Sequence, residues 1–253
     1  LAQQRMTILS SHEEFRSQAG RFLHQARAKA AQLVVFPELT GLMLAPPLIS
    51  GLKLEFIKRA DQGSQPTAGT ISRSLGRVSS AAAGVLGGGF RGSLNRLVTK
   101  RSGDLLDAYL EVMGSLAREY GMSIAGGSLF VEDAETAELR HRTYLFDPSG
   151  EVVGYQDKLN LSPDEEAVAT PGTEVNVLET RFGRLGLLIG RDVLYPELAR
   201  ALVLQGAELL VGVAASPGVA QARMLRSALQ IRAEENQVFS GISFLLGQNY
   251  VGR

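Results

Sequence analysis

The stretch GRLGLLIGRDVLYPELARALVLQGAELLV, residues 183–211, predicts a strand, a sharp turn and a helix in succession. Its apolar run, Leu185–Ile189, is typical of a strand that is buried on both faces. Pro196 suits the first turn of the following helix, and Gly206 suits its end. Gly190 stands at the top of the strand, where functional residues are often found. A site built at this turn therefore begins with a residue that has no side chain.

The rest of the chain continues the alternation of apolar strands and amphipathic helices. Helices are predicted over 12–30, 104–121, 196–205 and 221–237, and apolar strands over 33–36, 122–131, 207–215 and 238–247. Two hairpins, over 142–158 and 175–190, interrupt this rhythm, the first at the turn Asp147-Pro148-Ser149-Gly150. The pattern favours an α/β fold with a mixed sheet and helices outside, which can pair face to face with a second sheet.

Composition excludes several classes of function. The 253 residues carry 26 Lys and Arg against 26 Asp and Glu, so no overall field favours nucleic acid or an anionic membrane. The chain has no cysteine, which rules out disulfides, thiolate metal sites and thiol nucleophiles. His12, His24 and His141 are far apart and form no metal-binding pattern, so we expect no metal and no cofactor. No apolar run is long enough to cross a bilayer and no signal peptide is evident, so we expect a cytoplasmic protein.

Residues 63–103 break the pattern. The segment is rich in Gly, Ser and Ala, and it carries several Arg and Lys but no acidic residue. Weak periodicity over this length indicates an insertion or a lid within a single domain spanning 1–253. A basic surface arm that binds acidic ligands or lipid is the alternative. The glycines at 87–89 lack the Lys-Ser/Thr ending of a phosphate-binding loop.

Charged residues at strand ends carry the functional signal. Glu38 lies in VVFPELTG and Lys158 in VVGYQDKLNLSPDEE, each directly after an apolar or alternating strand. Together with LLIGRDVLYPE, PGTE and RAEEN, and in this order, these segments make the sequence resemble the nitrilase superfamily of carbon-nitrogen hydrolases. The resemblance covers nearly the whole chain. It implies a four-layer α-β-β-α sandwich.

The resemblance also implies roles for individual residues. Glu38 matches the general base, Lys158 the lysine of the triad, and Glu166 the second glutamate, with Glu165 as the adjacent candidate if the loop register slips by one. Gly190 stands where the family has its nucleophilic cysteine. The nucleophile position is therefore vacant, and realignment cannot fill it in a chain without cysteine.

Loss of the thiol removes the atom that attacks an amide or nitrile carbon. The resemblance therefore implies a carbon-nitrogen hydrolase that is impaired or inactive in thiol chemistry. Three alternatives are a structural Glu38–Lys158 ion pair inherited from an active ancestor, an engineered replacement at Gly190, and hydrolysis by water that Glu38 activates directly. In the last case a water could fill the space left by the glycine. Ser162 and Ser216 lack a nearby His and are not expected to act as nucleophiles.

Arg191 and Asp192 follow the vacant position and are candidates for substrate binding. An inward-pointing Arg191 could attract a carboxylate or pair with Glu38 or Glu166, whereas most arginines point to solvent. The expected ligand is a small amide, nitrile or carboxylate, and a non-catalytic binding or scaffold protein is the competing function. On the resemblance alone, residues 196–206 and 221–234 would form the face of a homodimer.

Overall fold

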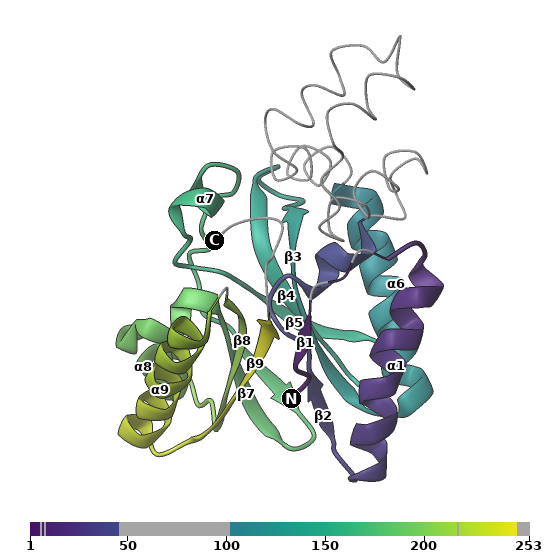
Figure 1. The fold of residues 1–253 in the computed structure, drawn as a ribbon. Coiled ribbons are helices and arrows are strands. Elements are labelled where there is room, and N and C mark those ends of the chain that lie inside the picture. The colour runs from purple at the N-terminus through teal and green to yellow at the C-terminus, as the bar shows by residue number, and fades with distance from the viewer. Residues whose placement is uncertain (6, 8, 46–101, 217, 247–253) are drawn as a thin grey trace.

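The computed structural model describes residues 1–45, 102–216 and 218–246, apart from residues 6 and 8. Two sheets pack face to face and helices cover their outer faces (Figure 1). This arrangement is the four-layer α-β-β-α sandwich that the sequence predicts. Among the described helices, none combines the length and the apolar composition that a membrane span requires.

The first sheet has four strands in the order β2-β3-β4-β5. Its strands are β2 (Leu33–Val35), β3 (Ser123–Glu132), β4 (Leu139–Phe146) and β5 (Val152–Asp157). β2 runs parallel to β3, and the β3–β4 and β4–β5 pairs are antiparallel. The β3–β4 register shifts between Ala125 and Ser128, which indicates a β-bulge.

The second sheet has five strands in the order β1-β9-β8-β7-β6. Its strands are β1 (Gln4–Arg5), β6 (Val177–Thr180), β7 (Gly183–Ile189), β8 (Leu209–Ser216) and β9 (Phe239–Leu246). β7, β8, β9 and β1 are parallel along this order, and β6 joins β7 as the antiparallel hairpin that the sequence predicts. The two-residue strand β1 was not predicted, because so short a segment shows no periodicity.

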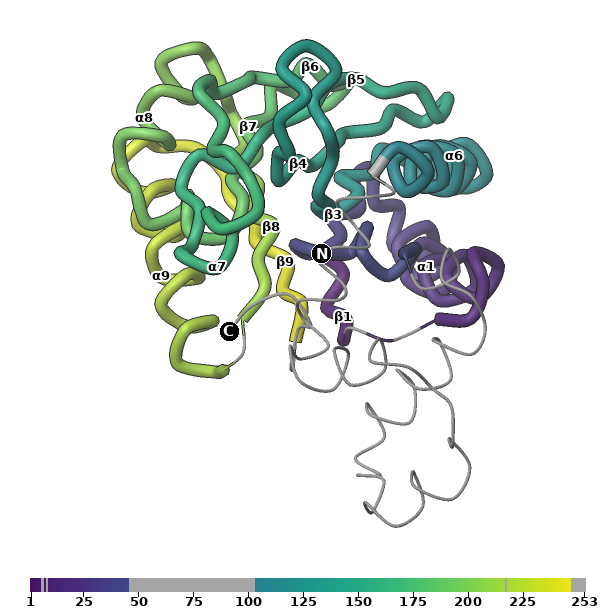
Figure 2. Tube along the Cα trace, turned by 90° about the horizontal axis from the view of Figure 1, so that it is seen from above, coloured from purple at the N-terminus to yellow at the C-terminus, as the bar shows by residue number. Residues whose placement is uncertain are grey.

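Helices α1 (His12–Ala28) and α6 (Ser102–Tyr120) cover the first sheet, and α8 (Pro196–Leu204) and α9 (Val219–Asn236) cover the second (Figure 2). Ser11 caps α1, since its side chain accepts a hydrogen bond from the Glu14 amide. Gly121, with φ +65°, ends α6 as predicted. An apolar layer that includes Val35, Leu187 and Val213 fills the space between the sheets.

Three short helices were not predicted: η1 (Thr40–Leu44), α7 (Pro163–Glu166) and η3 (Gly190–Leu194). Each follows a strand end that carries a candidate site residue or lies in the loop beyond it. Segments of four or five residues are too short for a hydrophobic period to reveal them. The predicted insertion at 63–103 lies outside the described residues except for its last two positions, which begin α6.

Candidate functional site

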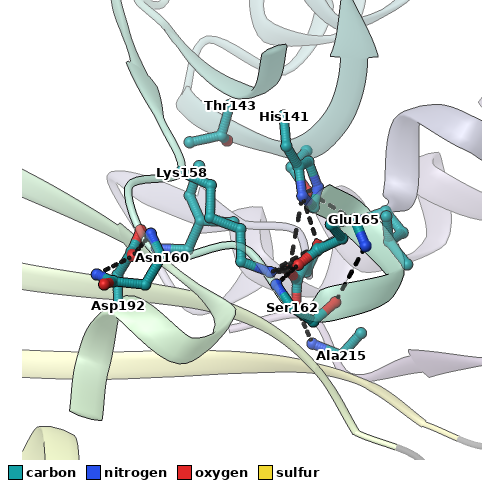
Figure 3. Close-up of polar contacts among 12 residues, drawn as sticks. His141, Thr143, Lys158, Asn160, Ser162, Glu165, Asp192 and Ala215 are labelled. Atoms are coloured by element: carbon teal, nitrogen blue, oxygen red, sulfur yellow. Dashed lines mark hydrogen bonds and ion pairs between the residues drawn. The ribbon is translucent and has the colours of Figure 1, made fainter. Parts of the chain in front are cut away.

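Lys158 forms the centre of a buried cluster of charges (Figure 3). It follows β5, and its Nζ lies 2.7 Å from Glu38 Oε1. The same Nζ lies 2.7 Å from Glu165 Oε1 and 2.9 Å from Glu165 Oε2. Only 3% of Lys158 and 4% of Glu38 is exposed. Burial at this depth is tolerated because each charge has an opposite charge in contact.

Glu38 joins the two sheets. It follows β2 and Pro37, and the next residue, Leu39, turns the chain through a left-handed conformation with φ +64°. Glu38 Oε2 accepts a hydrogen bond of 2.7 Å from the backbone N–H of Ala215 in β8. The carboxylate therefore contacts Lys158 of the first sheet with one oxygen and the second sheet with the other.

The glutamate that pairs with Lys158 is Glu165, so the assignment of this place to Glu166 is corrected to its neighbour. Glu166 is exposed. Ser162 caps α7, and the Glu165 carboxylate accepts a 2.7 Å hydrogen bond from the Ser162 backbone N–H. This capping box fixes the side chain at the start of the helix. The pattern Ser-Pro-Asp-Glu, with Glu three residues after Ser, is a sequence signal that could have identified Glu165 in advance.

His141 is a site residue that the sequence analysis did not assign. It lies in β4, fully buried, and its ring stacks on Phe130 with centroids 4.5 Å apart. His141 Nδ1 lies 2.9 Å from Glu165 Oε1, and His141 Nε2 lies 2.7 Å from Ser128 Oγ. A lone histidine in the polar run Arg-His-Arg-Thr gives no hint of this position, because β4 brings it to Lys158 only through antiparallel pairing with β5.

The charges of the cluster stabilise one another. Burial lowers the pKa of Lys158, but the Glu38 and Glu165 carboxylates outweigh it and raise this pKa overall. Burial raises the pKa of Glu165, yet the hydrogen bond from His141 and the Lys158 ammonium bring it well below its usual range. Lys158 is therefore an ammonium and Glu165 a carboxylate at neutral pH.

Gly190 lies against this cluster with φ +55°, a conformation that favours glycine. A Cβ added there would lie 2.7 Å from Glu38 Oε1, 2.9 Å from Glu38 Oε2 and 2.9 Å from Lys158 Nζ. These contacts are closer than carbon atoms tolerate. The two charged groups therefore border the volume that a side chain would take, and distances of this size to oxygen and nitrogen leave the expectation of a water beside Gly190 a prediction.

Arg191 and Asp192, the two candidates for substrate binding, lie in different surroundings. Asp192 is buried, and its carboxylate accepts hydrogen bonds from the Asn160 backbone N–H at 2.8 Å and from Asn160 Nδ2 at 3.0 Å. Burial raises the pKa of this carboxyl group. Asp192 thus ties the end of β7 to the loop after Lys158. Arg191 is half-buried and, within the described ranges, forms no ion pair with Glu38 or any other acid.

Three of these side chains could in principle hold a cation. Glu38, His141 and Glu165 bring possible ligand atoms within 4.8 Å of one another. The Lys158 ammonium lies 2.7 Å from the nearest oxygen of both glutamates, so a positive charge already occupies the place between them. A metal ion would have to displace it.

Comparison with known proteins decides the family. The model of the carbon-nitrogen hydrolase family matches residues 1–248. This chain belongs to the carbon-nitrogen hydrolase family. Among solved structures, a cysteine-to-alanine variant of the Nesterenkonia AN1 amidase superposes with a TM-score of 0.67 at 21% identity. The match covers 97% of this chain and 75% of that amidase. A carbon-nitrogen hydrolase from Helicobacter pylori G27 gives a TM-score of 0.66 at 18% identity, over 97% of this chain and 72% of its own.

Curated relatives of this carbon-nitrogen hydrolase family member match over shorter regions. The probable hydrolase YhcX of Bacillus subtilis is 31% identical over 60% of this chain and 29% of its own length. The deaminated glutathione amidase of Yersinia enterocolitica is 32% identical over 48% of this chain and 46% of its own. N-carbamoylputrescine amidase of Arabidopsis thaliana is 38% identical over 39% of this chain and 33% of its own. The chain thus spans less than half the length of these relatives.

Proposed function

We propose that this chain is a carbon-nitrogen hydrolase homologue that has lost covalent thiol catalysis and binds a small amide-bearing ligand at the Glu38–Lys158–Glu165 cluster. One observation carries the proposal: a side-chain carbon at position 190 would lie 2.7 Å from Glu38 and 2.9 Å from Lys158. A side chain at this position would press on the groups that would assist a thiolate, and the chain has no cysteine.

The contacts of Lys158 limit what it can donate to a ligand. In acyl transfer, a lysine in this place would donate to the oxyanion that develops on the substrate. An ammonium has three N–H bonds. Lys158 makes three short contacts, one to Glu38 and two to Glu165. Because the two Glu165 oxygens belong to one carboxylate, a single N–H serves both, and one N–H of Lys158 remains for the carbonyl oxygen of a ligand.

The charge of the cluster favours one ligand class over the others. Two carboxylates face one ammonium, so the centre carries a net negative charge while His141 is neutral. A carboxylate ligand would be repelled, and a nitrile has no hydrogen to donate. An amide N–H₂ group can donate to Glu38 or Glu165. A cysteine-to-alanine variant of the Nesterenkonia amidase is known in complex with butyramide, which shows that in that protein an amide is held without the thiol.

A hydrolysis assay tests the loss of catalysis. Release of ammonia from a panel of aliphatic amides is measured for the natural chain and for Glu38→Gln and Gly190→Cys. We expect the natural chain to match the buffer blank. Hydrolysis by the natural chain that Glu38→Gln abolishes would contradict the proposal and favour water activated by Glu38. Hydrolysis gained only by Gly190→Cys would show that the thiol alone was missing.

A binding assay tests the ligand class with three molecules of one carbon skeleton: butyramide, butyrate and butyronitrile. Saturation-transfer NMR on the natural chain should detect butyramide and neither of the other two. Glu38→Gln should weaken the butyramide signal, whereas Glu166→Gln, a change of the same kind on an exposed neighbour, should leave it intact. Binding of butyrate in preference to butyramide would disprove the charge argument.

We also propose that the chain forms a homodimer through α8 and α9, the helices that contain 196–206 and 221–234. Both helices cover the second sheet, and they leave large apolar side chains exposed on the outside. These are Leu204, Met224 and Ile231, with Phe239 at the start of β9. Such a surface is typical of a protein–protein interface.

A further inference from the structure

A chain of hydrogen bonds leads from the backbone near Glu38 through the first sheet to Lys158. The Leu39 backbone N–H donates to Ser128 Oγ over 2.9 Å. Ser128 Oγ lies 2.7 Å from His141 Nε2, and His141 Nδ1 lies 2.9 Å from Glu165 Oε1. Glu165 in turn receives the hydrogen bonds from Lys158. Leu39 directly precedes η1, and Ser128, His141 and Glu165 lie in β3, β4 and α7, respectively.

The groups at the two ends of this series of hydrogen bonds, a backbone N–H and a carboxylate, fix its direction. A backbone N–H can only donate, so Ser128 Oγ accepts from Leu39. An ionised carboxylate can only accept, so His141 Nδ1 carries a proton that it donates to Glu165. The Ser128 hydroxyl hydrogen is then free to donate to Nε2. Every donor meets an acceptor when His141 is neutral and protonated at Nδ1, and this tautomer is assigned from the network.

An imidazolium would fit less well. It would donate from Nε2 to Ser128 Oγ, which already accepts from Leu39. The Ser128 hydroxyl hydrogen would then need another acceptor, and the described residues provide none in contact with it. Burying that hydrogen without a partner would be unfavourable, since both Ser128 and His141 are fully buried.

The hydrogen-bonded series Ser128–His141–Glu165 has the geometry of a nucleophilic triad, but its orientation excludes that role. Ser128 is 0% exposed, and it lies on the side of the imidazole away from the Lys158 cluster, beyond Nε2. Its oxygen is held by the Leu39 N–H. A nucleophile needs access to substrate, whereas this hydroxyl is enclosed by the protein. What remains for it is to orient the histidine.

We propose that Ser128 and His141 are positioning residues that hold Glu165 against Lys158 and keep the Lys158 ammonium shared between two carboxylates. This inference concerns the protein without ligand. It rests on the proposed function only where it assumes that the ligand binds at Lys158. Glu165 stands on a helix of four residues and has one further anchor, the Ser162 backbone N–H. The hydrogen bond from His141 fixes the oxygen that contacts Lys158.

The first test needs no variant and no ligand. Long-range ¹H–¹⁵N NMR at pH 8 distinguishes the tautomers of His12, His24 and His141 in the natural chain. We expect one histidine, His141, to be held with the proton on Nδ1 and with Nε2 unprotonated. His24, which is exposed, should show the averaged pattern of a solvated ring, and His12, whose Nε2 lies 3.3 Å from the Leu44 carbonyl oxygen, should carry its proton on Nε2. A proton on Nε2 of His141, or averaging as in His24, would overturn the proposal.

A matched pair of variants tests the effect on Lys158. His141→Phe keeps the stacking on Phe130 and removes both nitrogens, whereas His141→Asn places an amide N–H close to the position of Nδ1. The ¹⁵N resonance of the Lys158 ammonium, observed at low temperature, is the readout. We expect it in the natural chain and in His141→Asn, and its shift or loss in His141→Phe. An unchanged resonance in His141→Phe would contradict a positioning role.

Labelling excludes or reveals the other role of Ser128. A fluorophosphonate probe, which marks nucleophilic serines, should leave the natural chain unmodified. Modification at Ser128, absent from Ser128→Ala, would overturn the assignment to positioning. These measurements do not depend on butyramide binding or on amide hydrolysis, so failure of the proposed function leaves their outcome readable.

Discussion

Gly190 shows how one residue without a side chain determines the packing of a site. Its backbone keeps the positive φ of a tight turn, and its missing side chain lets Glu38 and Lys158 approach. Two effects would therefore oppose any replacement: backbone strain at φ +55° and displacement of a buried ion pair. They can be separated, because Gly121 has φ +65° with nothing within 4 Å of an added Cβ.

Gly121→Ala should lower the free energy of unfolding by about 1–2 kcal/mol, the cost of a left-handed conformation for a residue with a Cβ. Gly190→Ala should lower it by a further amount of about 1–3 kcal/mol, because Glu38 and Lys158 must also move. Urea unfolding of the two variants and the natural chain measures the difference. Equal losses would show that the space at Gly190 is not crowded.

The lowered pKa of Glu165 predicts a pH dependence of stability. Burial opposes ionisation, but His141 and Lys158 bring the pKa below its ordinary value of 4.5. The pairing therefore adds to stability above about pH 4.5, and this contribution is lost as the pH falls through the folded-state pKa. Glu165→Gln, which retains a capping side chain, should be less stable than the natural chain at pH 7, with a gap that narrows below pH 4.5.

Urea unfolding of the natural chain and Glu165→Gln at a series of pH values measures that gap. Glu166→Gln is the matched control, since it removes a charge of the same sign from an exposed position on the same helix. It should follow the natural chain at every pH. A gap between the natural chain and Glu165→Gln that stays constant with pH would show that the carboxylate contributes nothing through its charge.

At the scale of elements, the short helix α7 positions one of the charged residues of the cluster. Its capping box holds Glu165 at the cluster, although the helix has only four residues and no buried side chain. Ser162→Ala removes the side-chain cap, and such losses are typically about 1 kcal/mol. Hydrogen exchange should therefore speed up over 162–169 in Ser162→Ala and return towards the natural rate in Ser162→Asp. Unchanged exchange in Ser162→Ala would show that the cap contributes little.

The elements also show how far the sequence reveals the molecule. The strands and long helices were predictable because apolar runs and a clear 3.6-residue period mark them. Glu38 and Lys158 were predictable because each follows such a strand. The second glutamate was assigned to Glu166, one position away from Glu165, because the resemblance aligned the loop and the Ser162 capping signal was not weighed. His141 was not assigned, because its role arises from strand pairing and not from its neighbours in sequence.

For the molecule as a whole, the exposed apolar side chains of α8 and α9 predict association. Leu204 is 78% exposed and Ile231 is 44% exposed. If these helices form the dimer face, Leu204→Glu together with Ile231→Glu should give monomers in sedimentation at micromolar concentration. Val152→Glu is the control, because Val152 is 43% exposed on β5 of the other sheet. A natural chain that sediments as a monomer would disprove the dimer.

The bond from Ala215 to Glu38 has a consequence for how such chains evolve. Glu38 closes the gap between the two sheets, and removal of one partner from a buried charge pair typically costs about 3–5 kcal/mol. Selection for a folded protein alone would then preserve Glu38 and Lys158 after the nucleophile had gone. If the nucleophile was lost at position 190, as we propose, an unchanging glutamate and lysine in such a lineage would be a signature of architecture, and the pair alone would not indicate amidase activity.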